Sequence, residues 1–267
     1  MAKTAKTLGR LFNAGLSMMG LKLVRSGRPE SMHRQQVADP HTRGMQVECI
    51  GPSGVGKTTL VRLFRERARF GWFFDYPAES PSKPNLDAGN GRGELYKTLL
   101  LRKSQSILAQ EYSADHSLAL IAFYIGRLQQ DLKVLQSGNL NEVGTWWDDG
   151  VVHVFTNELQ EQLEENPDSI GFFGNRVVIN CVAPVKVIVD RLAQRSRSKP
   201  NAMNDWYAVH GQDAIHGYVE AGLARKRRFL DLWQALGGEA YTLDLSEQES
   251  ALSEMLRIEE RIVSSRT

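Results

Sequence analysis

Apolar residues along the chain alternate between short β-branched or aromatic runs and longer stretches at helical spacing. The short runs predict buried strands around 45–50, 71–76, 143–147, 176–182 and 241–245. Residues recurring every three or four positions predict helices over 57–69, 94–109, 116–136, 156–165, 185–198, 215–236 and 247–263. Strands that alternate with helices in this way predict an α/β fold with a parallel sheet.

The first predicted strand leads directly into a glycine-rich turn and then into a helix. Residues 51–58, GPSGVGKT, fit the pattern G-x-x-x-x-G-K-[ST], in which glycines let successive N–H groups converge on phosphate oxygens. The new helix points its positive end at the same place. We therefore expect nucleoside triphosphate binding, with Lys57 reaching the β- and γ-phosphates and Thr58 holding Mg²⁺. An ordinary glycine turn before a helix is the alternative.

The predicted nucleotide-binding residues of this motif are Gly51, Pro52, Ser53, Gly54, Val55, Gly56, Lys57, Thr58 and Thr59.

The remaining composition narrows the functional classes. The chain has 267 residues and a net charge of +2, which gives room for one sizeable domain and implies no general affinity for nucleic acid. Cys49 and Cys181 both lie in apolar runs, which predicts buried thiols rather than a disulfide or a metal pair.

Residues 1–44 differ in composition from the rest of the chain. Basic residues far outnumber acidic ones there, and apolar residues recur at helical spacing over 1–27, followed by a linker. A basic amphipathic helix of this kind can lie on an anionic membrane surface, whereas a tail or a helix docked on its own domain is the alternative. We expect a cytoplasmic protein, with peripheral contact at the inner face of the membrane as one option, and a nucleotide-binding domain over 45–267.

Three carboxylates follow predicted strands. In open parallel sheets, ligands bind beyond the carboxyl ends of the strands. Asp75 follows the aromatic run at 71–74, and Asp148 and Asp149 follow the run that ends in Trp147. We expect Asp75, or one member of the Asp148–Asp149 pair, to orient an acceptor hydroxyl, and Asp149 to contribute to the metal site. Turn or capping roles are the alternative for all three.

The second half of the chain adds basic side chains. The helix over 185–198 becomes basic toward its end, where Arg191 and Arg195 can contact polyphosphate. A polar segment, about 196–211, is predicted to be a lid. Arg127, in the middle of a predicted helix, could reach an acceptor pocket, but we favour a solvated or salt-bridged side chain. The basic run 225–228 is interpreted as a solvated helix face.

Taken over residues 45–263, this order of elements resembles the P-loop kinases of nucleosides and nucleotides, such as thymidylate kinase, deoxynucleoside kinases and adenylate kinase. The resemblance implies a three-layer fold with a five-stranded parallel sheet in the order 2-3-1-4-5 and a lid. It rests on the glycine motif, on Asp148–Asp149 and on Arg191-Leu-Ala-Gln-Arg195, which matches the R-L-x-x-R pattern of these kinases. By that match, Arg191 lies against the adenine, Arg195 contacts the phosphates, and Ser246 lies in the adenine-contacting loop after the last strand.

The acceptor side departs from each member of that family. Tyr76 separates Asp75 from Pro77, whereas deoxynucleoside kinases place a glutamate directly before a proline, and no Asp-Arg-Tyr signature follows the third strand. The sequence therefore predicts an ATP- and Mg²⁺-dependent phosphotransferase that acts on a small hydroxyl- or phosphate-bearing acceptor, as a monomer or a homodimer. The alternative is a P-loop switch or nucleotide-binding module with a protein or membrane partner, although no N-K-x-D or L-S-G-G-Q motif supports it.

Overall fold

The computed structural model describes residues 44–74, 91–136, 144–198 and 211–265, to which all structural statements below refer. Its strands are β1 (Gln46–Ile50), β2 (Trp72–Phe73), β3 (Gly144–Trp147), β4 (Arg176–Val182) and β5 (Glu239–Asp244). Its helices are α2 (Lys57–Arg67), α3 (Arg92–Leu108), α4 (Ala114–Gln136), α5 (Val151–Val154), α6 (Thr156–Glu165), the 3₁₀ helix η1 (Pro167–Phe173), α7 (Val185–Ser198), α9 (Gly211–Ala235) and α10 (Gln248–Ser264).

The strands form one parallel sheet in the order β2-β3-β1-β4-β5. The α/β class and the predicted strand order are therefore confirmed. β1 lies in the centre, and Val47 has Trp146 of β3 on one side and Val177 of β4 on the other. Because parallel strands all end at the same edge, the segments that follow β1, β3 and β4 come together there.

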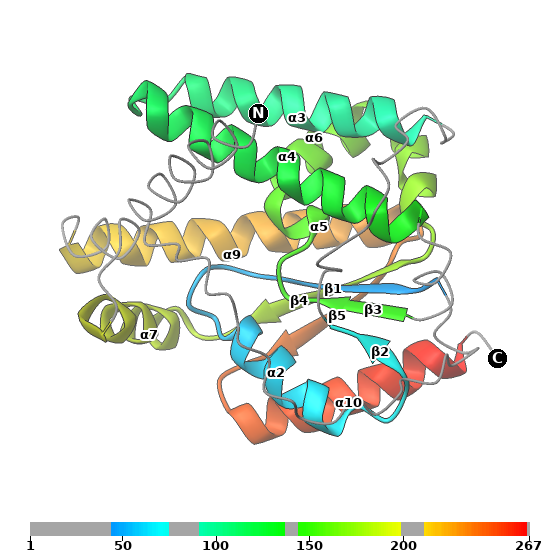
Figure 1. Ribbon diagram of the computed structural model, residues 1–267. Helices are drawn as coiled ribbons and strands as arrows, with labels where there is room; N and C mark the ends of the chain where they lie inside the picture. The colour runs from blue at the N-terminus through cyan, green and yellow to red at the C-terminus, as the bar shows by residue number, and fades with distance from the viewer. Residues whose placement is uncertain (1–43, 75–90, 137–143, 199–210, 266–267) are drawn as a thin grey trace, which may run out of the picture.

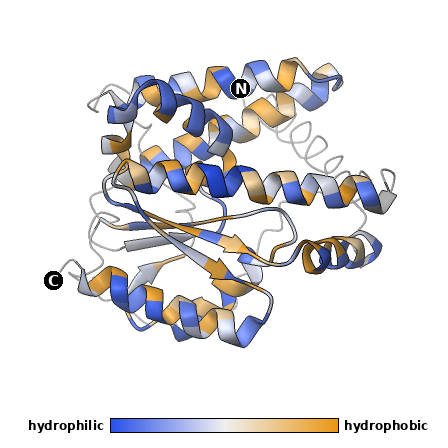
Figure 2. Ribbon diagram, turned by 180° about the vertical axis from the view of Figure 1, so that it is seen from behind, coloured by the Kyte–Doolittle hydropathy of each residue, from blue (hydrophilic) through white to orange (hydrophobic). Residues whose placement is uncertain are grey.

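Helices cover both faces of the sheet, which gives three layers (Figure 1). On one face, α2 and α10 bury Phe64 and Met255 in a core shared with the strands. The opposite face is covered by α3, α4, α5, α6 and α9, whose core includes Leu99, Phe155 and Trp233. Hydrophobic residues run along the strands and along one side of the surrounding helices, as the amphipathic pattern predicts (Figure 2).

Two polar residues of β1 are buried and have polar partners. Arg176 donates from Nη1 to Glu48 Oε2 at 2.8 Å and from Nη2 to Asp131 Oδ1 at 2.7 Å, and Nη2 also contacts Gln46 Oε1. Asp131, which belongs to α4, also accepts a hydrogen bond from the hydroxyl of Tyr96 in α3. The buried cation of Arg176 is thus paired with two carboxylates, and these contacts tie α3 and α4 to the centre of the sheet.

The predicted helices and strands agree with the structure within a few residues at their ends, apart from the run around 71–76, which is described as a strand only over β2. Two short elements, α5 and η1, were not predicted, because helices of four and seven residues are too short to show a helical period. The predicted burial of Cys49 and Cys181 as thiols is confirmed.

Candidate functional site

The turn between β1 and α2 has a backbone conformation that favours glycine. Gly51, Gly54 and Gly56 have φ angles of 146°, 82° and 115°. A Cβ on Gly51 would lie 2.6 Å from the carbonyl oxygen of Cys181, and one on Gly54 would lie 2.6 Å from Leu192 Cγ. Backbone angle and close packing therefore both require glycine in this glycine loop (residues 51–56).

The N-terminus of α2 opens directly from the glycine loop. Gly56 is the N-cap residue, no side chain caps the helix, and its first turn carries no acidic residue. The first N–H groups of a helix have no acceptor within the helix itself. With Thr58 and Thr59 exposed beside them, these donors and the positive helix end offer binding groups for an anion.

Lys57 is folded over the glycine loop. Its Nζ donates to the carbonyl oxygens of Gly51 at 2.8 Å and of Pro52 at 3.3 Å. Burial lowers the pKa of Lys57, although the nearby Cys181 and Asp149 act in the opposite direction. The ammonium group is thus held by neutral oxygens. An anionic oxygen in their place would form a stronger hydrogen bond, because both partners would then be charged.

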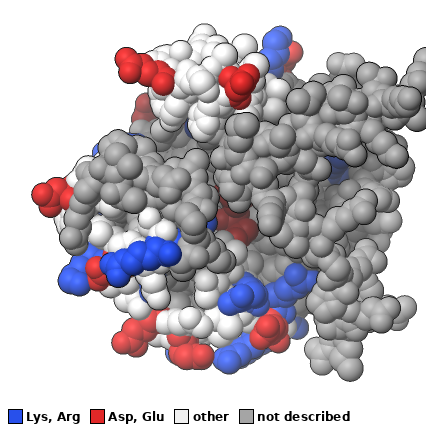
Figure 3. Space-filling view, turned by 60° about the vertical axis from the view of Figure 1, so that its left-hand side comes forward, with Lys and Arg blue, Asp and Glu red and all other residues white. Residues whose placement is uncertain are grey.

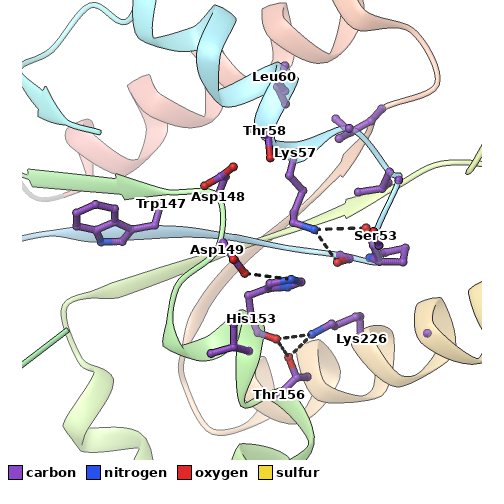
Figure 4. Close-up of a pocket in the computed structure, with 18 of the residues that line it drawn as sticks. Ser53, Lys57, Thr58, Leu60, Trp147, Asp148, Asp149, His153, Thr156 and Lys226 are labelled. Carbon is purple, nitrogen blue, oxygen red and sulfur yellow. Dashed lines mark hydrogen bonds and ion pairs between the residues drawn. The ribbon is translucent and has the colours of Figure 1, made fainter. Parts of the chain in front are cut away.

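Asp148 and Asp149 follow β3 and lie at the same sheet edge as the glycine loop, as predicted. Figure 4 shows that Asp148 points toward Thr58, whereas Asp149 points toward His153. Asp149 Oδ2 accepts a hydrogen bond from Arg127 Nη2 at 2.9 Å, and its Oδ1 lies 3.5 Å from His153 Nε2. Burial raises the pKa of Asp149, while Arg127 lowers it. The two adjacent carboxylates therefore face different partners.

Glu48 fixes the turn that carries Asp149, a role that the sequence analysis missed. Its Oε1 accepts the backbone N–H of His153 at 2.5 Å, near the start of α5. Burial raises the pKa of Glu48, and Arg176 lowers it. A glutamate in the central strand, where only Gln46 is also polar, was the available signal, because a buried carboxylate needs specific partners.

Arg191 joins the glycine loop to the segment after β5. It donates from Nη1 to Val55 O at 2.6 Å and from Nη2 to Leu245 O at 2.8 Å. The next residue, Ser246, donates its backbone N–H to Asp244 Oδ1 at 2.8 Å. The residues matched to the adenine side, Arg191 and Ser246, are therefore neighbours.

These elements surround a cleft of about 1140 Å³. Figure 3 views the molecule from a side on which an inner group of Asp or Glu atoms is partly visible, with several Lys and Arg side chains below it. Charged residues of both signs line the cleft, and the basic ones are in excess: Lys57, Lys103, Arg127, Arg191, Arg195, Arg225 and Lys226 against Asp148 and Asp149. Aromatic residues complete the wall: Phe74, Phe123, Tyr124, Trp147 and Tyr218. The cleft is large enough for a nucleotide and a second small molecule.

Two further cleft residues, His153 and Lys226, were not predicted. The solvated-face interpretation of the basic run is wrong for Arg225 and Lys226, which are half-buried in the cleft wall, and right for the exposed Arg227 and Arg228. The helical period could have indicated the position of Lys226. This residue lies three positions before a buried phenylalanine and therefore on the inner side of α9. His153 lies in α5, a helix too short to be predicted.

Burial and the surrounding cations Lys57, Lys226, Arg127 and Lys103 lower the pKa of His153 well below its usual value. Its imidazole is therefore neutral near pH 7. The Nδ1 atom is buried and has no hydrogen-bond partner among the residues that the structure describes. A neutral imidazole beside a carboxylate and several cations adds a polar group to the cleft without adding charge.

Several predicted features lie outside the described residues. They include Asp75, residues 199–210 of the predicted lid and the basic segment 1–27, so their roles remain predictions. Arg195 is described and lines the cleft, and its contact with the phosphates stays a prediction. Within the described ranges, no helix combines the length and apolar character needed to cross a membrane.

Neither the protein-family models nor the curated proteins searched contain a match to this chain. The residues and the geometry of the cleft are therefore the basis for inferring a function.

Proposed function

We propose that this protein is an ATP-dependent phosphotransferase that transfers the γ-phosphoryl group of MgATP to a small nucleoside-, nucleotide- or sugar-like acceptor. The observation that carries the proposal is the N-terminus of α2. There an uncapped helix end, a loop with three positive φ angles and the ammonium group of Lys57 meet at the carboxyl edge of a parallel sheet. These groups together suit a polyphosphate chain.

In this proposal, the N–H groups of residues 51–59 hold the β- and γ-phosphates, and Lys57 exchanges its loop carbonyls for phosphate oxygens. Arg195 adds positive charge to the phosphate side, and Arg191 with Ser246 marks the adenine side. Phosphoryl transfer needs positioning and stabilisation of charge more than it needs covalent chemistry by the protein, and this set of donors supplies both.

The residues present fit a magnesium ion. Its ligands would be the exposed hydroxyl of Thr58 and the carboxylate of Asp148, which points toward Thr58 in Figure 4. In the described part of the chain, no cluster of three or more His, Cys, Asp or Glu side chains could hold a metal. Magnesium commonly keeps several waters and binds through one or two protein groups plus phosphates, so a two-residue site is sufficient. When bound, the ion neutralises developing phosphate charge.

On the acceptor side, we assign Asp149 to orient the acceptor hydroxyl and to accept its proton. Asp149 is positioned by Arg127 at 2.9 Å, and burial raises the pKa of this carboxyl group, which favours proton uptake. Asp75 keeps the same predicted role from outside the described residues.

The test is turnover by Lys57→Ala. Activity is measured as acceptor-dependent release of ADP from MgATP, with a panel of nucleosides, nucleoside monophosphates and sugars as acceptors. We expect a loss of about 10²–10³-fold or more, as is typical for removing a charge-stabilising donor. Lys186→Ala is the matched control, because Lys186 is 84% exposed and lies outside the cleft. Circular dichroism verifies that both variants fold.

An unchanged rate in Lys57→Ala would contradict the proposed role of the glycine loop. ADP release that depends on a macromolecule instead of a metabolite would indicate the P-loop switch. Nucleotide binding with no turnover would indicate a binding module.

A further inference from the structure

Lys226 lies in the middle of α9, on the wall of the cleft. Its Nζ donates to the carbonyl oxygen of His153 at 3.0 Å and also contacts Thr156 Oγ1. In Figure 4, Lys57 and Lys226 approach the ring of His153 from opposite sides, one from α2 and one from α9. Two neutral oxygens thus occupy two of the three donor positions of this ammonium group.

Other cations on the acceptor side of the cleft are paired with carboxylates. Arg127 contacts Asp149 at 2.9 Å, and Lys103 contacts Glu158 at 2.9 Å. Lys226 forms no such ion pair within the described ranges. The carboxylate of Glu48 acts on it at longer range, but Glu48 is itself held by Arg176 at 2.8 Å.

The surroundings of Lys226 disfavour its charged form. Burial, together with the positive charge of Lys57, lowers the pKa of Lys226 to about 7, and Lys103 and Arg225 act in the same direction. Buried charges in proteins are normally paired. Lys226 lies on a cleft wall and has no carboxylate partner within the described ranges. These are the properties of a lysine that pairs with an anionic group of a ligand.

We propose that Lys226 binds a phosphoryl oxyanion inside the cleft that it shares with Lys57. The proposal rests on the proposed function and narrows it, because it adds a second phosphate anchor on α9. The oxyanion has two potential sources, the γ-phosphate of the nucleotide or a phosphate group on the acceptor. If the acceptor carries no phosphate group, the γ-phosphate of the nucleotide is the only oxyanion that Lys226 can bind.

The competing explanation is structural, since Lys226 also joins α9 to the junction of α5 and α6 through His153 and Thr156. The two explanations differ in what happens on Lys226→Met. Removing a structural hydrogen-bond donor lowers stability and weakens every ligand together. Removing a ligand anchor leaves the ligand-free protein at least as stable, because a buried cation is lost, and weakens only ligands that bring an oxyanion to that wall.

The experiment measures dissociation constants by calorimetry for wild type, Lys226→Met and Arg228→Met. Arg228 is exposed on the same helix and is the matched control. The probes are MgADP, the Mg²⁺ complex of a non-hydrolysable imido analogue of ATP, orthophosphate added to the MgADP complex, and pyrophosphate alone. Urea unfolding gives the stability of each ligand-free protein.

We expect Lys226→Met to bind MgADP as wild type does and to unfold at the same or a higher urea concentration. Binding of the ATP analogue or of orthophosphate should weaken by about 10- to 100-fold, as for a lost charge-assisted hydrogen bond. A loss confined to the analogue assigns the oxyanion to the γ-phosphate, and a loss confined to orthophosphate assigns it to the acceptor. Arg228→Met should match wild type throughout.

Unchanged affinity of Lys226→Met for all probes would overturn the inference. So would a fall in the stability of this variant with equal weakening of every probe. Absence of binding of any probe to wild type would overturn it as well. Failure of the proposed function is distinguishable. If wild type binds no MgADP but binds pyrophosphate, and Lys226→Met loses that binding, the glycine loop is not a nucleotide site while Lys226 is still an oxyanion anchor.

Discussion

At the scale of single residues, Gly150 shows how the absence of a side chain helps to position the neighbouring carboxylate of Asp149. Gly150 directly follows Asp149, and a Cβ at this position would lie 2.5 Å from Glu48 Cδ. Glu48 has little room to move, because Arg176 holds it at 2.8 Å and the backbone of α5 donates to it. The conformation of the turn is therefore coupled to the central strand of the sheet.

Gly150→Ala should destabilise the fold by about 1–3 kcal/mol, because the added methyl group must displace a buried, hydrogen-bonded carboxylate. Gly126→Ala is the control, since Gly126 lies within α4 with nothing near its Cβ position, and it should stabilise by about 0.5–1 kcal/mol. Urea unfolding of both variants tests this. Equal stability of the two would show that Glu48 relaxes without cost.

At the scale of elements, α10 holds the connection between α2 and β2. The carboxylate of Glu259 accepts the backbone N–H groups of Arg69 and Phe70, at 3.1 and 3.2 Å, and the indole N–H of Trp72 at 2.7 Å. One side chain of α10 thus satisfies three donors at the entrance to the edge strand. β2 is only two residues long, so this contact supplies much of its anchoring.

Glu259→Ala should cost about 1–3 kcal/mol, because it leaves buried donors without acceptors. The neighbouring Glu260→Ala should cost about 0–1 kcal/mol, since Glu260 forms only a surface ion pair with Arg69. Chemical denaturation monitored by tryptophan fluorescence compares them. A Glu260 variant as unstable as the Glu259 variant would refute the argument.

Contacts between elements also explain which features could be predicted from the sequence and which could not. Element order, strand order and the glycine motif follow from local periodicity and from a resemblance carried by short motifs. The roles of Glu48 and Lys226 depend on what lies across from them, in β4 for one and in α5 and α6 for the other. Local patterns do not encode such long-range partners, so the role of Glu48 was not predicted and the basic run was predicted to be a solvated helix face.

At the scale of the whole molecule, the cleft is built from segments distributed along the described chain. The turn after β1, the end of β3, α7, α9 and the segment after β5 all contribute residues. A ligand that contacts several of these walls binds the folded state and not the unfolded chain. Binding should therefore raise the stability of the entire domain.

A non-hydrolysable ATP analogue with Mg²⁺, at 100 times its dissociation constant, should stabilise the protein by about 2.7 kcal/mol. For a domain of this size, that corresponds to a rise in Tm of about 5–10 °C. Chelation of Mg²⁺ should remove much of the rise, and Lys57→Ala should remove more. A thermal shift that is indifferent to Mg²⁺ would argue against the assignment of Thr58 and Asp148.

The bonds made by Arg191 also bear on how the chain matures. This guanidinium contacts residue 55, 136 positions earlier, and residue 245, 54 positions later. During translation, the glycine motif leaves the ribosome long before the segment with Leu245 is made. Until that segment docks, Arg191 lacks its carbonyl acceptors after β5. The nascent chain therefore contains the glycine motif before Arg191 can link it to the segment after β5. The proposed nucleotide site is therefore complete only after residue 246 has been synthesised and folded into place.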